Sequence, residues 1–394
     1  KILEHKWVKT IYWIPWEENL DLIESVRQSG KIELILTRNE QTAVFMAATY
    51  GRLTWEVGVA IATLGPGATN MVTGVAYAQL WGFPVMVITG QKPIKKSKQW
   101  LFQIIDVVAM MKPITKYATT IVSGSRIPYI LNNAFRIATS ERPGAVHIEL
   151  PEDIAGESIE NMDFEITNEK IRRPIIDEKS ILRLKKELEH AKKPIILIGA
   201  GANRKRITKY LWAFIHKYDM PFFTSQMGKW VIHEDSKHYL WTAALTSNDY
   251  IHQAISKADL ILSVGYDPIE KPTHLVGEWG TKTIHINFYE ANMDQVYNPY
   301  LEMIGDIGNT FWQLCDTDID TSNWDFSEIY ALRDEYVKKI DANLALEVWE
   351  SWPMWPRQLV ADVRNVLSSH DIVALDNGLY KVWFARNYKA FAPN

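Results

Sequence analysis

One carboxylate, that of Glu40, stands where an α/β protein could use it for chemistry. Residues 32–36 have the composition of a strand and residues 41–52 the periodicity of a helix, so Glu40 falls at the joint between them. A Gly-Pro-Gly turn at residues 65–67 follows the next strand candidate, residues 57–63. Ligands of parallel sheets bind at the carboxyl ends of strands, so the turn and Glu40 would share one rim. The alternative is an ordinary exposed or N-capping Glu at a helix start.

The stretch around Glu40 and the residues that carry the turn resemble the pyrimidine-binding domain of thiamine-diphosphate enzymes of the acetolactate synthase large-subunit type. The resemblance extends from about Trp7 to the last residue. It implies that Glu40 hydrogen-bonds N1′ of the cofactor's pyrimidine, so that the 4′-amino group becomes basic enough to remove the C2 proton. Gln103, in a Phe-Gln pair, is the second catalytic residue implied, because a side-chain amide can donate to a developing oxyanion. The alternative for Gln103 is a solvated loop residue.

The resemblance also implies which residues contact the cofactor. The turn and the Asn that follows it would shape the pocket for the aminopyrimidine, although a tight βα turn without a ligand would look much the same. The residues implied are Pro15, Trp16, Gly65, Pro66, Gly67, Asn70, Gly199, Gly201 and Asp306.

A second α/β segment opens with a strand candidate at residues 194–198 that runs into Gly199 and Gly201. It resembles the middle domain of the family, which binds FAD in acetolactate synthases proper. The third Gly of a dinucleotide fingerprint is absent, and the stretch after Gly265 lacks the Arg of the flavin-binding members. Asp306 matches a position near the flavin, but Asp is equally ordinary in a turn. The sequence therefore does not decide whether the middle domain binds FAD, but it favours a domain without FAD.

The alternation of β-rich runs with amphipathic helices predicts an α/β fold. We expect two complete parallel-sheet domains, pyrimidine-binding and then Rossmann-like, and the start of a third. The expected boundaries are 1–156 for the first domain, 157–179 for a linker, 180–330 for the middle domain, 331–355 for a second linker and 356–394 for the start of a diphosphate-binding domain. Further strand candidates are residues 85–89, 142–153, 222–224, 260–264 and 283–287, and residues 371–378 resemble the opening strand and turn of the family's diphosphate-binding domain.

The family's Gly-Asp-Gly motif, which helps to hold the Mg²⁺ that bridges the cofactor's diphosphate, does not follow Gly378. We therefore expect the chain to be a fragment with one wall of an active site, and no metal ligand is assigned in it. In the family the neighbouring subunit holds the diphosphate. The resemblance thus implies a homodimer or tetramer with the active site between subunits, and it allows a regulatory subunit.

The composition is that of a globular protein. The 394 residues, 47% hydrophobic and 23% charged, suffice for two or three domains. The formal net charge of −4 gives no electrostatic reason to expect nucleic acid. Cys315 is the only cysteine, which excludes an internal disulfide and fits a reducing compartment. No apolar run approaches the ~20 residues of a membrane span, and no signal-peptide pattern is present. We expect a cytoplasmic protein that binds neither nucleic acid nor membrane.

Tryptophan is anomalous in this chain. There are 16 Trp against 13 Phe, and nine of them stand where the resemblance calls for Gly. Gly serves positions of positive φ or close backbone approach, where an indole brings strain. One error would produce all nine, namely UGA codons that the organism reads as Gly but that were translated as Trp. The alternative is a divergent protein with real Trp as packing, which suits Trp312, Trp324 and Trp383. The nine positions are Trp7, Trp13, Trp16, Trp55, Trp81, Trp100, Trp230, Trp241 and Trp279.

The resemblance implies a thiamine-diphosphate-dependent carboligase. Such an enzyme decarboxylates pyruvate and transfers the two-carbon unit to a second 2-oxo acid, as in branched-chain amino acid biosynthesis, so its partners would be small 2-oxo acids. Pyruvate oxidases, 2-oxo acid decarboxylases and sulfoacetaldehyde acetyltransferases share the same motifs. A second interpretation is a non-catalytic nucleotide-binding or subunit-interaction protein.

Overall fold

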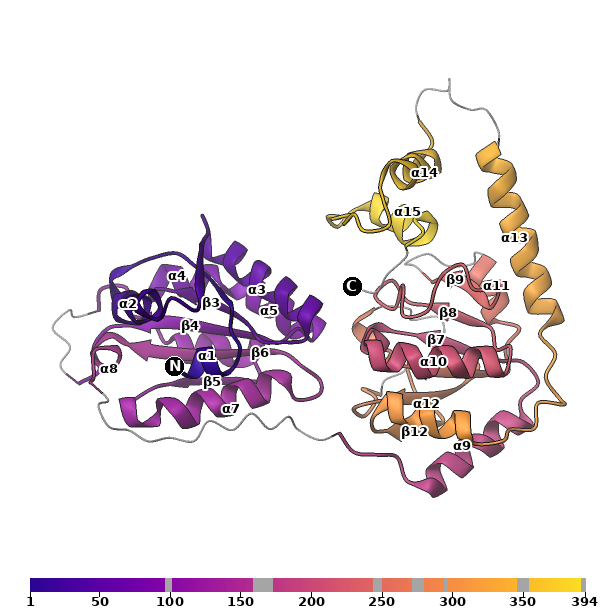
Figure 1. Cartoon of the computed structure of the whole chain (residues 1–394), viewed down its shortest axis with the longest axis horizontal. Helices are drawn as coiled ribbons and strands as arrows, with labels where there is room; N and C mark the ends of the chain where they lie inside the picture. Colours follow the sequence, from indigo (N-terminus) through magenta and orange to yellow (C-terminus); the bar gives the residue numbers. More distant parts are fainter. Residues whose placement is uncertain are drawn as a thin grey trace. The chain divides into compact units, whose positions relative to one another are not determined.

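The computed structural model describes residues 1–95, 101–158, 173–243, 250–270, 280–293, 297–345 and 354–390. The chain forms two compact units, Lys1–Arg172 and Arg173–Asn394. Each unit contains a six-stranded sheet in which every strand pairing is parallel (Figure 1). The predicted α/β class with two parallel sheets is confirmed.

The sheet of the first unit has the strand order β2-β1-β3-β4-β6-β5. The strands β3, β4 and β6 are buried at every position, as expected where helices cover both faces of a parallel sheet. The strands are β1 (Thr10–Trp13), β2 (Glu33–Leu36), β3 (Gly58–Ala62), β4 (Val85–Gln91), β5 (Tyr117–Thr120) and β6 (Ala145–Pro151).

Helices lie on both faces of this sheet. Apolar residues of four helices join one face in a single core: α1 (Ile2–His5), α2 (Leu20–Ser29), α7 (Ile127–Thr139) and α8 (Glu152–Ala155). On the opposite side from α7, α3 packs on β3 and on α5 (Figure 1). The helices of that side are α3 (Glu40–Thr54), α4 (Gly65–Asn70) and α5 (Val72–Trp81). The short α6 (Val107–Met111) packs beside β5 and β6.

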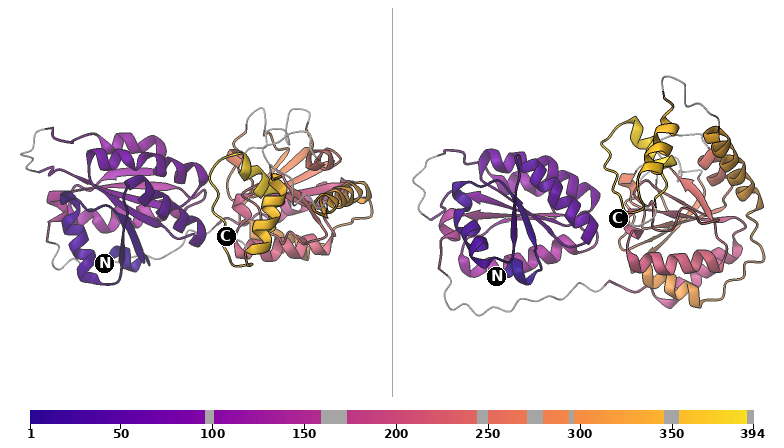
Figure 2. Two further views of the ribbon diagram at one scale, coloured as in Figure 1. Left: turned by 90° about the horizontal axis from the view of Figure 1, so that it is seen from above. Right: turned by 45° about the horizontal axis from the view of Figure 1, so that its top comes forward.

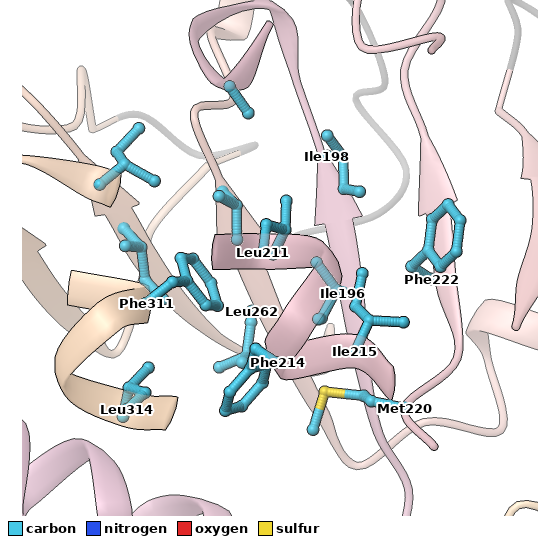
Figure 3. Close-up of a cluster of buried hydrophobic side chains, with 14 of the residues drawn as sticks. Ile196, Ile198, Leu211, Phe214, Ile215, Met220, Phe222, Leu262, Phe311 and Leu314 are labelled. Atoms are coloured by element: carbon cyan, nitrogen blue, oxygen red, sulfur yellow. The ribbon is translucent and has the colours of Figure 1, made fainter. Parts of the chain in front are cut away.

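The sheet of the second unit has the order β12-β11-β10-β7-β8-β9. Its larger core joins one face of the sheet to three amphipathic helices. Figure 3 shows Phe214 and Phe311, from two of these helices, within this core, and their ring centroids lie 5.2 Å apart. Figure 2 gives two further views. The strands are β7 (Pro194–Ile198), β8 (Phe222–Thr224), β9 (Tyr239–Thr242), β10 (Leu260–Val264), β11 (Lys282–Asn287) and β12 (Leu301–Ile304), and the three helices are α9 (Glu178–His190), α10 (Lys205–Lys217) and α12 (Ile307–Asp316).

The alternate side chains of the same strands form a second core with α11 (Tyr250–Ile255) and with Ile329 of α13 (Ser327–Ala345). The expected linker from residue 331 is therefore helical as far as Ala345, and most of the linker expected at 157–179 lies outside the described residues. Among the described helices, none is long and apolar enough to span a membrane.

The strand expected at residues 371–378 is wrong. Residues 371–376 have no regular structure, between α14 (Pro356–Val366) and α15 (Leu379–Asn387). A strand needs a neighbour to pair its backbone N–H and C=O groups, and no described strand runs beside this segment. Instead, Val373 packs against the small cluster that α14 and α15 form with Trp230.

Four of the nine questioned tryptophans have a positive φ: Trp7 (63°), Trp55 (60°), Trp230 (79°) and Trp241 (150°). Among the described residues, no other tryptophan does. Trp100 and Trp279 lie outside the described residues. A positive φ is disfavoured for residues with a Cβ. The hypothesis that Gly codons were translated as Trp therefore stays a prediction, and these four backbone angles support it.

The ends of helices α2, α3 and α5 allow a direct comparison of Trp with Gly in the same backbone conformation. Helices α2 and α5 end at Gly30 (φ 63°) and Gly82 (φ 69°), and α3 ends in the same conformation at Trp55. After α1, Trp7 N–H donates to the carbonyl of Glu4 and Val8 N–H to that of Leu3, which is the Schellman pattern. The left-handed residue of such ends is usually Gly.

Buried indoles add a second difference. The Nε1 atoms of Trp13 and Trp241 are buried without a hydrogen-bond partner, an arrangement that costs stability. In contrast, Nε1 of Trp324, which lies outside the questioned set, donates to the carbonyl of Leu188 at 2.9 Å.

His147 is a structural histidine. It is fully buried in β6, and its Nε2 lies 2.9 Å from Oγ1 of Thr89 on β4. Burial lowers the pKa of His147 to about 3. The folded protein therefore holds the neutral imidazole.

We expect Trp7→Gly to raise the free energy of unfolding by about 1 kcal/mol, because it removes the cost of a left-handed residue with a Cβ and its side chain is 71% exposed. The control is Trp212→Gly in the interior of α10, where Gly should lower stability by about 1 kcal/mol. Urea unfolding of both variants measures whether each substitution raises or lowers the free energy of unfolding. A destabilised Trp7→Gly protein would contradict the explanation.

We expect the stability of His147→Gln to decrease less steeply with falling pH than that of the wild type. The pKa of His147 is lower in the folded than in the unfolded state, so protonation favours unfolding as the pH falls from about 6.5 towards about 3. Melting temperatures of wild type and variant should converge across that window. The exposed His5→Gln control should follow the wild type at every pH, and an H147Q profile parallel to wild type would contradict the assignment.

Candidate active site

Glu40 is the first residue of α3, directly beyond the carboxyl end of β2. The helix is capped by its neighbour Asn39, whose side-chain oxygen accepts from the N–H of Gln41 at 2.8 Å. Glu40 is therefore not needed as a cap. The positive end of the helix dipole stabilises a negative charge at this position.

The Glu40 carboxylate turns towards the next βα connection. Nδ2 of Asn70, the last residue of α4, donates to Oε2 of Glu40 at 3.0 Å. A Cβ at Gly67 would lie 3.4 Å from Oε1 and 2.6 Å from Cγ2 of Thr63. The absence of a side chain at Gly67 thus keeps the space beside Oε1 open while Asn70 fixes the other oxygen.

Gln103 lies against the start of the same turn. Gly65 has a φ of 46°, and a Cβ there would lie 2.6 Å from the carbonyl oxygen of Gln103. Gln103 itself has a φ of 57°. The structure thus brings Glu40, Asn70, the turn and Gln103 to one rim. The sequence predicts this placement for Glu40 and the turn.

Pro15 and Trp16 follow β1, which lies between β2 and β3 in the sheet, so they lie on the same rim. Both side chains are exposed, that of Trp16 by 54%. The φ of Trp16 is −155°, an extended conformation open to any residue.

Sequence reasoning missed a buried ion pair beside this rim. Nζ of Lys92, which follows β4, lies 2.7 Å from Oε1 of Glu18 and 3.0 Å from Oε1 of Glu17. Oγ1 of Thr63 donates to Oε2 of Glu18 at 2.5 Å. Lys92 and Glu18 are each 2% exposed.

Both groups of this pair are charged in the folded protein. Burial opposes ionisation of Glu18, but the hydrogen bonds from Lys92 and Thr63 outweigh it and lower the pKa of the carboxyl. Burial likewise opposes the charge on Lys92, but Glu18 and Glu17 outweigh it and raise the pKa of the amine. Because the partners stand 74 positions apart, only the folded sheet shows them to be neighbours. In the sequence, Lys92 looks like part of an exposed basic run.

The ion pair joins the carboxyl ends of β1, β3 and β4. Beside it, Nδ2 of Asn19 donates to the buried carbonyl of Ala62 at 2.8 Å. A Cβ at Gly90 would lie 2.8 Å from Cβ of Glu18, so β4 fits closely under this loop. Thr63 contacts both the ion pair and Gly67, and it therefore connects the pair to the surroundings of Glu40.

A cavity of about 530 Å³, partly lined by Lys92, opens at the carboxyl ends of β4, β5 and β6. Its polar wall is Glu149, whose oxygens accept from Nε2 of Gln91 at 2.9 Å and from Oγ1 of Thr120 at 2.7 Å. Burial raises the pKa of Glu149. Side chains such as Ile94 and Ile105 form the apolar part of the lining.

The remaining predicted residues belong to the second unit. Gly199 and Gly201 lie at the carboxyl end of β7. Asp306 caps α12, since its Oδ1 accepts from the N–H of Asn309 at 2.7 Å. In the part of the chain that the structure describes, no three His, Cys, Asp or Glu residues are arranged to hold a metal ion.

We expect Lys92→Met to lower the free energy of unfolding by about 3–5 kcal/mol, because it leaves the Glu18 carboxylate buried without its cation. The double variant Lys92→Met/Glu18→Gln should recover part of that loss. Urea unfolding measures both. As a matched control, Lys95→Met removes a lysine that is 55% exposed and whose partner Glu157 is partly exposed, and it should cost at most about 1 kcal/mol. A Lys92→Met protein as stable as Lys95→Met would contradict a structural role for the pair.

The chain is similar over nearly its whole length to several acetolactate synthases. It is 29% identical to the acetolactate synthase of Bacillus subtilis (strain 168), in a match that covers 98% of this chain and 68% of the relative. It is also 29% identical to a probable acetolactate synthase large subunit of Methanocaldococcus jannaschii, with 100% and 68% covered. For the catabolic acetolactate synthase of Raoultella terrigena the identity is 27%, with 99% and 69% covered.

Two family profiles match the chain, one in each of its two units. The profile described as "Thiamine pyrophosphate enzyme, N-terminal TPP binding domain" matches residues 1–110, which contain Glu40, the Gly-Pro-Gly turn and Gln103. The profile described as "Thiamine pyrophosphate enzyme, central domain" matches residues 181–314, from α9 to α12. The chain therefore belongs to the thiamine pyrophosphate enzymes and carries their N-terminal and central domains.

Proposed function

We propose that this chain provides the pyrimidine-binding wall of an acetolactate synthase-like carboligase, which decarboxylates pyruvate and transfers the two-carbon unit to a second 2-oxo acid. The similarity to acetolactate synthases along the whole chain supports the reaction class. The single observation that carries the proposal is the Glu40 carboxylate, with Oε2 held by Asn70 and Oε1 beside the side-chain-free Gly67.

The residues of the rim fit thiamine diphosphate. When bound, this cofactor supplies an acidic C2 carbon and a ring that accepts the electron pair released on decarboxylation. Oε1 of Glu40 would accept a hydrogen bond from N1′ of the pyrimidine and so control where the proton on the aminopyrimidine resides. Asn70 keeps the carboxylate oriented, and a side chain at position 67 would close the space that the pyrimidine edge needs.

Gln103 contributes to the substrate side of the same rim in this proposal. Its backbone is fixed against Gly65, so its amide would be presented from a rigid turn. A preorganised amide donor stabilises the oxygen charge that develops during decarboxylation and transfer.

The described residues do not fit a Mg²⁺ site. We propose that Mg²⁺ and the cofactor's diphosphate are held by other parts of the assembled enzyme, in a homodimer or tetramer that brings a second wall to Glu40. Since the Glu40 carboxylate is only partly exposed and is anchored through Asn70, its geometry is present before such an assembly forms.

We expect Glu40→Gln to slow hydrogen–deuterium exchange at C2 of bound thiamine diphosphate by about 10²- to 10⁴-fold, the usual contribution of a positioned acid or base. Gln keeps the size of the side chain but lacks the negative charge that favours proton transfer through N1′. The measurement is quenched-flow proton NMR of the cofactor in the assembled natural enzyme.

Glu33→Gln is the matched control, because it removes an exposed carboxylate at the opposite end of β2. Its exchange rate should equal that of the wild type. An unchanged rate in Glu40→Gln would remove the basis of the proposed function.

A further inference from the structure

The connection after β7 has the sequence Gly-Ala-Gly-Ala at residues 199–202, the kind of loop that cradles a phosphate with backbone N–H groups. In this fold all four of those groups already have a protein acceptor. The N–H of Gly199 donates to Val264, that of Gly201 to Gly265 and that of Ala202 to Gly199, each to a carbonyl at 2.8–3.1 Å. The fourth donor, Ala200 N–H, points to a side chain: it donates to Oε1 of Glu270 at 2.9 Å.

Glu270 lies after β10 in a short 3₁₀ turn, and its side chain is 8% exposed. Oε1 accepts a second hydrogen bond from the N–H of Asp267 at 3.1 Å. Oε2 accepts from Oγ of Ser225, which itself accepts from the N–H of Gly228 at 3.0 Å. One carboxylate thus links the loops that follow β7, β8 and β10.

The glycines of these loops are explained by this closure. A Cβ at Gly199 would lie 2.5 Å from Cα of Tyr266, and one at Gly265 would lie 2.4 Å from the nitrogen of Ala202. Gly265 also has a φ of 61°. The two loops therefore need glycine in order to pack on one another, with no phosphate required to account for it.

We infer that the Glu270 carboxylate occupies the place of a nucleotide phosphate at the 199–202 loop, so that the central domain does not bind FAD through this loop. A phosphate could reach Ala200 N–H only by displacing Glu270 from its hydrogen bonds, and leaving buried polar groups unpaired is unfavourable.

Protonation does not open the loop. Burial raises the pKa of Glu270 to about 7, so both forms are populated near neutral pH. In either form one oxygen remains available to accept from Ala200. The ionised form would in addition repel a phosphate, as would the neighbouring Asp267.

The inference is independent of the proposed thiamine chemistry, since it concerns a different unit of the chain. A flavin titration decides it in the natural protein: FAD fluorescence is followed as wild-type protein, Glu270→Gln and Asp267→Asn are added. We expect no quenching or anisotropy change with any of them. Stoichiometric FAD binding by the wild type would overturn the inference whatever the outcome of the Glu40 experiment.

Amide exchange at Ala200 tests the contact itself. In Glu270→Ala, Ala200 N–H should exchange with deuterium at least about tenfold faster than in wild type. The variant lacks the carboxylate that accepts this N–H, so less free energy is needed to open the loop locally and expose the amide to solvent. Asp267→Asn is the matched control, since it removes one charge from the same loop without touching Ala200. Equal protection of Ala200 in a folded Glu270→Ala protein would overturn the inference, and if that variant does not fold, the wild-type flavin titration decides alone.

Discussion

The buried Glu18–Lys92 ion pair is the interaction on which the first unit's functional rim depends. It connects the carboxyl ends of β1 and β4, and Thr63 extends it to β3. Two opposite charges at 2.7 Å with 2% exposure are stable only when both remain present and hydrogen-bonded. The strand ends are therefore held in one arrangement, and the turn beside Glu40 inherits that rigidity through the contact of Thr63 with Gly67.

The two units use buried carboxylates in opposite ways. Glu18 faces a lysine and stays ionised, and it supports a neighbouring carboxylate that remains partly exposed. Glu270 faces neutral donors, and burial raises its pKa to about 7. It closes the loops that a ligand of a parallel sheet would be expected to enter. In the first sheet the rim at Glu40 stays partly exposed, whereas in the second sheet Glu270 closes the loop at residues 199–202. The two sheets are of the same class, so this difference lies in a few side chains rather than in the fold.

The features that were predicted correctly from the sequence depend on residues that are close together in the chain. Strands β8 and β10 have the expected bounds, and Glu40 falls at its joint because strand and helix periodicity are local properties. The Glu18–Lys92 pair and the Glu270 contact to Ala200 were not predictable, since their partners stand 74 and 70 positions apart and meet only through the strand order. The strand expected at residues 371–378 failed for the same physical reason, because a strand exists only where a partner strand does.

The parallel pairing of both sheets has a consequence for folding kinetics. Each neighbour must be brought back by a crossover: β4 pairs with β6 from Val85 with Ala145 onwards, and the central β7 pairs with β10 through Ile195 and Ile261. Such non-local closures carry a loop entropy that must be overcome before any pairing energy is gained. A polypeptide emerging from the ribosome can complete the first sheet once β6 is available, whereas the second sheet must wait for β12 to complete its edge. Slow, stepwise folding with transiently unpaired strand edges is thus built into this topology.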